Sequence, residues 1–358
     1  MTAITVEARA TNPHIRLQSE ALTVTVTPGK GSDITSIIHR PSGQETLWQS
    51  PWGERPSGYA LPESDSVDAW MQGFAGGWPL MVPNASTACI HRSIRHSFHG
   101  EASLAPWDWA LDGEALTLRL AFYTLPLIMT RRLSLDGDLL LIEETLTNDG
   151  VEPVELIWGH HPSFGGALLD GPARLTSGAR RVTADGNPDA RGNALRSGHE
   201  SDWPHSIADD GSPLDLRTPL EGQHGMAYLH DFTEGWAGLT RTDGAIGIAL
   251  SWDTALFPTA WLWQEMGSSK GGPWFGRGRV VGIEPCTSWP SIGLAATAEQ
   301  GRNLLALAPD ERRETALRLH VFTGLGEVAG VRDGRARGIA PGSTGVNPDR
   351  SALGGGRW

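Results

Sequence analysis

The chain has 358 residues, and its 41 Asp and Glu residues outnumber its 29 Lys and Arg residues, which gives a formal net charge of −12. Such a field repels nucleic acid and anionic membrane surfaces, so neither is expected as a partner. The two cysteines, Cys89 and Cys286, form no CxxC pair, which excludes a disulfide scaffold and a cysteine-ligated zinc site. The sequence begins without a basic leader and has no apolar run of about 18 residues, so we expect a cytoplasmic protein without a membrane span.

The predicted elements are short strands. With 45 glycines and 24 prolines the chain turns often, which favours strands over long helices, and no segment keeps an apolar pattern of helical period. The pairs Asp112-Gly113, Asp136-Gly137 and Asp243-Gly244 predict hairpin turns. In chain order, strands are predicted at Ala21–Val26, Ala115–Ala121, Leu139–Leu146, Val154–Trp158, Ala245–Trp252, Arg279–Ile283 and Ala316–Phe322. Strands without helices predict an all-β protein of packed antiparallel sheets.

No linker divides the strand-rich part of the chain, so residues 1–332 are predicted to form a single domain. Within it, the polar residues 176–216, rich in Gly, Asp and Arg, are interpreted as a long excursion between strands. Residues 333–358 are rich in Gly, Arg and Pro, which predicts a disordered tail. We expect a monomer or a homodimer.

Two early segments carry polar side chains beside tryptophan. Trp78 and Asn84 belong to a rigid Gly- and Pro-rich loop, in which Asn84 either binds a ligand or caps its own turn. His99 precedes a glycine, where a backbone can approach a ligand closely, and Trp107 follows a few residues later. Tryptophan offers a flat face for stacking on a sugar ring, although we expect about half of the tryptophans to fill the β core. The spacing of His91, His96 and His99 matches no zinc pattern, so no metal is expected.

Two later segments place titratable groups where strands end. His160 and His161 follow the strand Val154–Trp158, and imidazole can serve as acid or base near neutral pH. The alternative to a catalytic role is a buried histidine that only forms a hydrogen bond with a backbone carbonyl. Glu284 directly follows the strand Arg279–Ile283. Half-burial at the end of a strand raises the pKa of a carboxyl group, which suits a general base. The alternative is an ordinary surface glutamate.

Signatures of other chemistries are absent from the sequence. No P-loop, no G-x-S-x-G elbow and no G-x-G-x-x-G after a strand occurs. The segment Gly267–Gly278 is glycine-rich and carries Lys270 and Arg277, which could contact an anionic group on a ligand.

Taken together, these motifs resemble the galactose mutarotase-like family, which includes the aldose 1-epimerases. The resemblance runs from about Ala21 to Phe322 and identifies the chain with a divergent branch, because the Asn-Arg pair that precedes the first histidine in the family is missing. It rests on the order of His99-Gly100, His161-Pro162-Ser163-Phe164 and Glu284-Pro285-Cys286-Thr287.

The resemblance implies a β-supersandwich of two large antiparallel sheets around a carbohydrate cleft. It assigns Glu284 as the base that takes the anomeric proton and His161 as the acid at the ring oxygen, with His160 as the nearest rival. It assigns His99 to binding sugar hydroxyls and requires neither metal nor cofactor. The substrate is then a free small-molecule sugar. Its further contacts are expected from Asn84, Trp78, Trp107 and Gln264. An aspartate that binds sugar hydroxyls in the family has no clear counterpart here, and Gln264 or Glu265 is the expected substitute.

Three hypotheses follow. The first is a mutarotase that acts on a free, unusual or modified sugar. The second is a carbohydrate-binding protein of the same fold without catalysis. The third is a lyase or hydrolase, because one fold hosts several chemistries. Glycoside hydrolysis would need a second carboxylate near Glu284, for which Glu265 and Asp253 are the candidates in the sequence.

Overall fold

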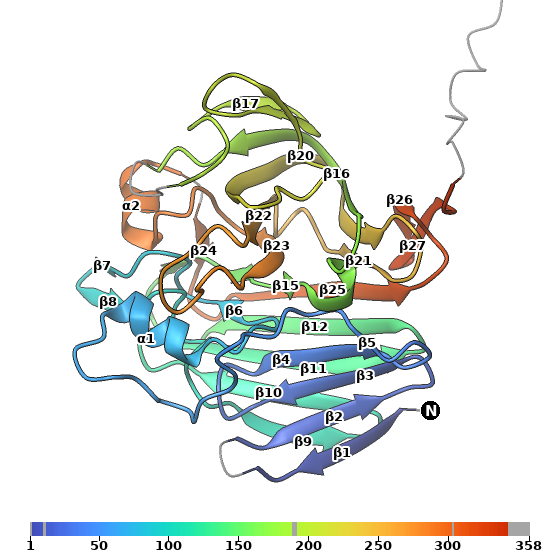
Figure 1. Ribbon diagram of the computed structural model, residues 1–358. Helices are drawn as coiled ribbons and strands as arrows, with labels where there is room; N and C mark the ends of the chain where they lie inside the picture. The colour runs from blue at the N-terminus through green and yellow to red at the C-terminus, as the bar shows by residue number, and fades with distance from the viewer. Residues whose placement is uncertain (1, 10–11, 188–191, 303, 343–358) are drawn as a thin grey trace, which may run out of the picture.

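Two antiparallel sheets make up most of the molecule (Figure 1). The structure is a computed structural model that describes residues 2–9, 12–187, 192–302 and 304–342. The smaller sheet has the order β1-β2-β3-β4-β5. Its strands are β1 (Ala3–Glu7), β2 (His14–Gln18), β3 (Leu22–Thr27), β4 (Asp33–His39) and β5 (Gln44–Glu45).

The larger sheet has the order β6-β14-β23-β22-β20-β21-β25-β12-β11-β10-β9, with β15 on β23 and with β16 and β17 beside β20. Its strands are β6 (Leu80–Met81), β9 (Asp108–Asp112), β10 (Ala115–Ala121), β11 (Leu127–Asp136), β12 (Leu139–Asn148), β14 (Gly159–His160), β15 (Ser163–Phe164), β16 (Ala173–Ala184), β17 (Glu200–Asp202), β20 (His224–Arg241), β21 (Gly247–Ser251), β22 (Thr259–Met266), β23 (Arg279–Cys286) and β25 (Arg312–Phe322).

Smaller elements decorate the two sheets. The two-stranded pairs are β7 (Cys89–His91) with β8 (Ile94–His96), β13 (Val154–Leu156) with β24 (Leu305–Leu307), β18 (His205–Ile207) with β19 (Pro213–Asp215), and β26 (Glu327–Arg332) with β27 (Arg335–Ile339). The helices are α1 (Ser66–Gly73), α2 (Leu294–Glu299) and the 3₁₀ turn η1 (Gly166–Leu168).

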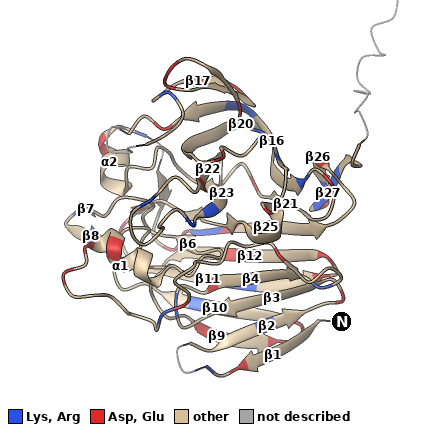
Figure 2. Cartoon of the chain, viewed as in Figure 1, with Lys and Arg blue, Asp and Glu red and all other residues tan. Residues whose placement is uncertain are grey.

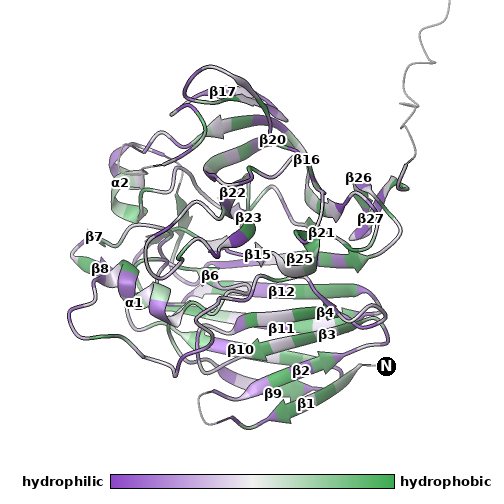
Figure 3. Ribbon diagram, viewed as in Figure 1, coloured by the Kyte–Doolittle hydropathy of each residue, from purple (hydrophilic) through white to green (hydrophobic). Residues whose placement is uncertain are grey.

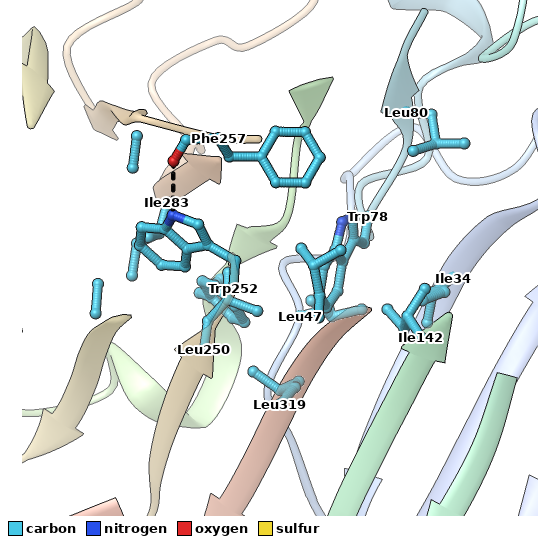
Figure 4. Packing of buried hydrophobic residues seen from close by; sticks show 14 of the residues in the cluster. Ile34, Leu47, Trp78, Leu80, Ile142, Leu250, Trp252, Phe257, Ile283 and Leu319 are labelled. Atoms are coloured by element: carbon cyan, nitrogen blue, oxygen red, sulfur yellow. Dashed lines mark hydrogen bonds between the residues drawn. The ribbon is translucent and has the colours of Figure 1, made fainter. Parts of the chain in front are cut away.

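Alternation of apolar and polar residues along the strands builds the core, and Figure 3 shows green and purple alternating on the strands of both sheets. One cluster of buried side chains joins residues of the smaller sheet, such as Val24 and Ile37, to residues of the larger one, such as Leu133 and Ile142. Trp252 lies in the same cluster and donates its indole N–H to the Phe257 carbonyl at 3.1 Å, as Figure 4 shows. Charged residues of both signs are interspersed along the ribbon (Figure 2).

The all-β prediction is confirmed, and so are the three Asp-Gly turns, which join β9 to β10, β11 to β12 and β20 to β21. The expected excursion at residues 176–216 is only partly right, because β16 extends to Ala184 and pairs with β20. The boundary of the expected tail is wrong, since Arg335–Ile339 form β27 against β26. The remainder of that tail, residues 343–358, lies outside the described residues.

Candidate functional site

Glu284 lies on β23, where the strand pairs with β22. Residues two apart on a strand share a face, so Glu284 and Gly282 lie on one side together with their cross-strand partners, Trp261 and Trp263. The carboxylate is only 2% exposed, and its Oε1 has no hydrogen-bond partner among the described residues. Burial therefore raises the pKa of Glu284 well above its usual value.

Gly282 makes room for this carboxylate. A Cβ at position 282 would lie 2.4 Å from Glu284 Oε1 and 3.2 Å from the Trp263 ring. No side chain can occupy that space unless the carboxylate moves. The glycine therefore leaves open the space in which the Glu284 carboxylate lies.

His161 faces Glu284. It follows β14, and its Nε2 lies 3.7 Å from Glu284 Oε1, too far for a direct hydrogen bond. Its Nδ1 lies 3.1 Å from Ser163 Oγ, and the aromatic rings of Trp70, Phe74 and Trp263 surround the imidazole. Burial lowers the pKa of His161 to about 4, so the free ring is neutral at neutral pH.

His160 points the other way, because neighbouring residues of a strand face opposite sides. Its Nδ1 accepts the indole N–H of Trp78 at 3.2 Å, and its Nε2 lies 3.2 Å from Glu144 Oε2. The ring is fully buried on the core side of the strand. Of the two histidines, His161 alone shares a cavity with Glu284.

His99 completes the group. The Ser86 amide donates to His99 Nδ1 at 3.0 Å, so the proton of the neutral ring lies on Nε2, where it is free to be donated. Burial, with the nearby charge of His161, lowers the pKa of His99 well below its usual value. A Cβ at Gly100 would lie 2.4 Å from the Val82 carbonyl, so this glycine allows close backbone packing rather than the approach of a ligand.

These three residues line one cavity of about 390 Å³, here called the Glu284 cavity. Its apolar wall mixes aromatic rings with thioethers, and its polar wall carries carboxylate, amide, imidazole and hydroxyl groups. The described residues that line it are Trp70, Met71, Phe74, Ser86, Thr87, Phe98, His99, His161, Asp185, Asn187, His224, Met226, Trp261, Trp263, Trp274, Glu284 and Ser291.

Asp185 is held in place at the polar wall. It follows β16, and its Oδ1 accepts the hydroxyl proton of Tyr228 at 2.8 Å. Tyr228 in turn accepts the Ser291 amide at 2.8 Å. Burial, together with the charge of Asp185, raises the pKa of Tyr228 well above its usual value, so the phenol keeps the proton that it donates.

Four residues expected to bind a ligand do not line the Glu284 cavity. Trp78 packs in the core beside Leu47 (Figure 4), and Trp107 donates its indole N–H to the Ala102 carbonyl at 3.0 Å. Asn84 donates to the Thr87 and Ser97 carbonyls and accepts the Leu294 amide, so it is a structural residue that joins three segments of the chain. Gln264 lies on the face of β22 opposite Trp263 and accepts the Leu220 amide at 3.0 Å. We therefore leave these four out of the site.

Several residues that line the cavity were not predicted from the sequence: Asp185, His224, Ser291 and the side chains that α1 contributes. Asp185 falls inside the segment interpreted as an excursion, so nothing in its neighbours marked it. A signal for α1 was present, because Asp65 caps the helix by accepting the Asp68 amide at 2.8 Å. That helix supplies Trp70 and Met71 to the cavity wall.

A larger cavity of about 600 Å³ is lined in part by residues of the segment Cys89–Ser97. Its carboxylate, Glu101, already accepts the amides of Tyr123 and Thr124 and the Thr124 hydroxyl. It therefore offers no free acid–base pair like that of the Glu284 cavity.

In the described part of the chain, no three His, Cys, Asp or Glu side chains gather closely enough to hold a metal ion. Nor does that part contain a helix with the length and apolar character needed to span a membrane.

Comparison with known proteins supplies a family and a fold. The model of one family, a domain of unknown function (DUF4432), matches residues 11–321. A search of curated proteins found no match. Solved structures do match, at identities low enough that they report on the fold alone.

Three of these structures illustrate the fold. A candidate aldose 1-epimerase from Klebsiella pneumoniae aligns with a TM-score of 0.69 at 17% identity, over 90% of this chain and 84% of that chain. The Slr1438 protein from Synechocystis aligns with a TM-score of 0.60 at 19% identity, over 90% and 96%. A galactose mutarotase-like protein from Lactobacillus casei aligns with a TM-score of 0.60 at 16% identity, over 86% and 99%. The chain therefore has the galactose mutarotase-like fold, the expected β-supersandwich.

Proposed function

This chain belongs to the DUF4432 family, and from its fold and the Glu284 cavity we propose that it is a mutarotase, which interconverts the α and β anomers of a free sugar. One observation carries the proposal. The buried carboxylate of Glu284 and the buried imidazole of His161 line the same cavity. Glu284 Oε1 and His161 Nε2 lie 3.7 Å apart and do not form a hydrogen bond with each other. A hemiacetal that opens and closes needs an acid and a base held in this way.

The proposed mechanism moves two protons. The pair holds one mobile proton, which rests on Glu284 because its pKa is the higher of the two, and in the reactive state this proton has passed to His161 while Glu284 is ionised. Glu284 takes the anomeric hydroxyl proton as His161 donates its own to the ring oxygen, and the C1–O5 bond breaks to give the open-chain aldehyde. Rotation about C1–C2 and the reverse transfers close the ring as the other anomer.

The surroundings tune both groups for this exchange. Burial raises the pKa of Glu284, which strengthens the carboxylate as a base. Burial lowers the pKa of His161 to about 4, which makes its protonated form a stronger acid. No metal or cofactor takes part in this scheme.

The remaining cavity residues suit a sugar ring. Trp263 and Trp274, which line the cavity, offer ring surfaces for sugar C–H groups, whereas Trp70 is 2% exposed and is covered by the Phe74 ring at 4.6 Å. His99 Nε2–H and the Asp185 carboxylate offer a donor and an acceptor to ring hydroxyls. We propose that Asp185 takes the place that the sequence analysis gave to Gln264 or Glu265.

Measurement of anomer exchange by proton NMR tests the proposal. The wild type, Glu284→Gln and the matched control Glu299→Gln, which changes an exposed glutamate of α2, are compared across a panel of free sugars. We expect wild type and control to accelerate the exchange of at least one sugar, and Glu284→Gln to lose about 10²- to 10⁴-fold of that rate.

Other outcomes would replace the proposal. If sugars bind but none exchanges faster than in buffer, the chain is a carbohydrate-binding protein without catalysis. Cleavage of a glycosidic bond would instead point to a hydrolase or lyase that uses Asp185 as the second carboxylate, since Asp253 is exposed and Glu265 is held by Ser268 and Ser269.

A further inference from the structure

A second cavity of about 540 Å³, here called the Tyr59 cavity, adjoins the Glu284 cavity. The chain from Trp52 to Ser64, the outer side of α1 and the loop that leads into β23 enclose it. The described residues that line it are Trp52, Arg55, Tyr59, Leu61, Pro62, Glu63, Ser64, Asp68, Met71, Gln72, Gly272, Pro273 and Phe275.

A thin partition separates the two cavities. Met71 of α1 lines both of them. Its neighbour Trp70 lines the Glu284 cavity, whereas Gln72 lines the Tyr59 cavity. In the loop, Trp274 lines the first and Phe275 the second, so the same helix and the same loop contribute residues to both cavities. Met71 is the flexible part of this wall, because an unbranched thioether side chain changes rotamer easily.

Aromatic rings continue from one cavity into the other. The Trp263 ring, beside Glu284, lies 5.9 Å from the Trp274 ring, and Trp274 lies 5.4 Å from Trp52 in the Tyr59 cavity. The rim of the Tyr59 cavity leaves Tyr59, Leu61 and Phe275 exposed by 41%, 55% and 63%. Single exposed apolar side chains are ordinary, but several around one cavity mark a binding surface.

Polar groups lie between these rings. Gln72 is fixed, because it accepts the Leu61 amide at 2.7 Å and donates to Ser64 Oγ at 2.9 Å. Glu63 and Asp68 add carboxylates. Aromatic faces with interspersed hydrogen-bonding groups are what a neutral sugar ring needs, because each ring presents C–H faces and a rim of hydroxyls.

The basic residues near this cavity do not form an anion site. The Arg55 guanidinium lies 5.7 Å from the centroid of the Tyr59 ring, and that of Arg277 lies 5.6 Å from the centroid of Phe275. Lys270 donates to the Gly267 carbonyl at 2.6 Å. Lys270 and Arg277, which could have met an anionic group, are thus engaged by other groups of the chain, and a neutral occupant suits the cavity better.

We infer that the Tyr59 cavity binds the non-reducing ring of a reducing disaccharide whose reducing ring occupies the Glu284 cavity. The inference rests on the proposed function, because it places the reducing ring beside Glu284 and His161. The anomeric hydroxyl stays free in such a sugar, so the same proton transfers apply to it. Tyr59 and Phe275 supply stacking surfaces for the second ring on the faces that Arg55 and Arg277 leave open. The link between the two rings passes where Met71 lies between the cavities, which requires a change of the Met71 rotamer.

The test compares glucose with maltose, cellobiose, isomaltose, lactose and melibiose, all of which have glucose at the reducing end. Anomer exchange is measured by NMR for wild type, Tyr59→Ala and Phe275→Ala. The matched control is Tyr123→Ala, which removes a 96% exposed tyrosine from outside this cavity. Titrations followed by tryptophan fluorescence report binding without catalysis, because Trp52 lines the Tyr59 cavity.

We expect at least one disaccharide to exceed glucose in kcat/KM. Tyr59→Ala and Phe275→Ala should raise KM for that disaccharide about three- to tenfold while leaving kcat and the values for glucose unchanged. The control should match the wild type. If no disaccharide exceeds glucose, or if both variants leave its KM unchanged, the inference is overturned although the proposed function stands.

Loss of the proposed function gives a different pattern. If the wild type exchanges none of these sugars, the mutarotase proposal fails for them, and the fluorescence titrations decide on the cavity. Saturable binding of a disaccharide that weakens in Tyr59→Ala, but not in Tyr123→Ala, would then support the Tyr59 cavity as a sugar site. No saturable binding would overturn it.

Discussion

Glu284 carries a stability cost that follows from its burial. Its pKa is raised in the folded protein above the usual value of 4.5, so the folded state holds the proton more tightly than the unfolded chain. The stability contribution of this group is therefore largest below pH 4.5, and it is lost as the pH rises through the folded-state pKa. At higher pH the buried charge opposes folding.

We therefore predict that Glu284→Gln makes the protein more stable at pH 8 by about 1 to 3 kcal/mol, because the wild type must either bury a charge or take up a proton when it folds at this pH, and glutamine does neither. At pH 4 the gain should shrink towards zero, since both states then hold the proton. Urea unfolding at the two pH values measures this, with the exposed Glu299→Gln as the control. An equal gain at both pH values would show that ionisation of Glu284 is not its cause.

Gly282 gives a second prediction at this scale, because its missing side chain leaves the space that Glu284 Oε1 occupies. Gly282→Ala should displace the carboxylate and lower kcat/KM for anomer exchange by about 10- to 100-fold. The control is Gly330→Ala on β26, where an added Cβ would meet no atom within 4 Å. Equal activities in the two variants would mean that the position of the carboxylate does not limit the reaction.

The residues that sequence motifs could predict are those that the backbone places directly. Glu284 and the pair His160-His161 stand in or beside paired strands, so strand position indicated where these groups lie, whereas the choice of His161 over His160 came from the resemblance to the mutarotase-like family. Alternation along β22 also explains why Gln264 does not line the cavity: Trp263 faces the cavity, so its neighbour Gln264 faces the other side of the sheet. Asp185 could not be predicted, because its place beside Tyr228 depends on the pairing of β16 with β20.

The loop of residues 267–278 depends on one carboxylate at the end of β22. Glu265 is 2% exposed, and its two oxygen atoms accept the amides and the hydroxyls of Ser268 and Ser269. Burial raises the pKa of Glu265, but these hydrogen bonds outweigh it and lower the pKa below its usual value. Because Trp274 belongs to this loop, Glu265 positions one wall of the Glu284 cavity.

Removal of this anchor should loosen the loop. We predict that Glu265→Ala increases amide hydrogen exchange across residues 267–278 and raises KM for the sugar about tenfold, with a smaller change in kcat. Hydrogen exchange followed by mass spectrometry and steady-state kinetics measure the two effects. Glu265→Gln keeps an acceptor oxygen and should lie between wild type and Glu265→Ala. Unchanged exchange in the alanine variant would contradict the role of an anchor.

Secondary-structure elements could be predicted where a few neighbouring residues in the sequence determine them. The Asp-Gly turns needed only a few residues and were found. The helix α1 was missed because eight residues cannot show a long helical period, although the cap at Asp65 marked its start. The strand β27 was missed because Gly and Arg dominate its composition, and its pairing with β26 comes from register rather than from apolar content.

A buried ionic network connects distant parts of the whole molecule. Arg131 of β11 donates to Glu144 of β12 at 2.7 Å, and to the carbonyl and hydroxyl of Ser32 beside the smaller sheet at 2.9 and 2.6 Å. His160 approaches the other oxygen of Glu144. Burial raises the pKa of Glu144, but His160 and Arg131 outweigh that effect and lower the pKa below its usual value.

Adjacent glutamates on β12 allow a matched test. Glu144→Ala should destabilise the protein by about 3 to 5 kcal/mol, because it leaves Arg131 buried without its counter-charge. Glu143 faces solvent and pairs with Arg132 at 2.8 Å, so Glu143→Ala should cost only about 0 to 1 kcal/mol. Urea unfolding of both variants decides this. Equal losses would show that the buried network contributes no more than a surface pair.

The strand order of the larger sheet also sets when the site can form during synthesis. The hairpin of β11 and β12 joins neighbouring segments and can form as soon as both have been made, whereas β14 pairs with β23. Next to that contact, the Trp158 amide donates to the Thr287 hydroxyl across 129 positions of the chain. Pairings between such distant segments form slowly, because a long loop must close first. A ribosome-bound chain therefore holds His161 for some time before Glu284 exists, and a chain that terminates early lacks one half of the Glu284–His161 pair.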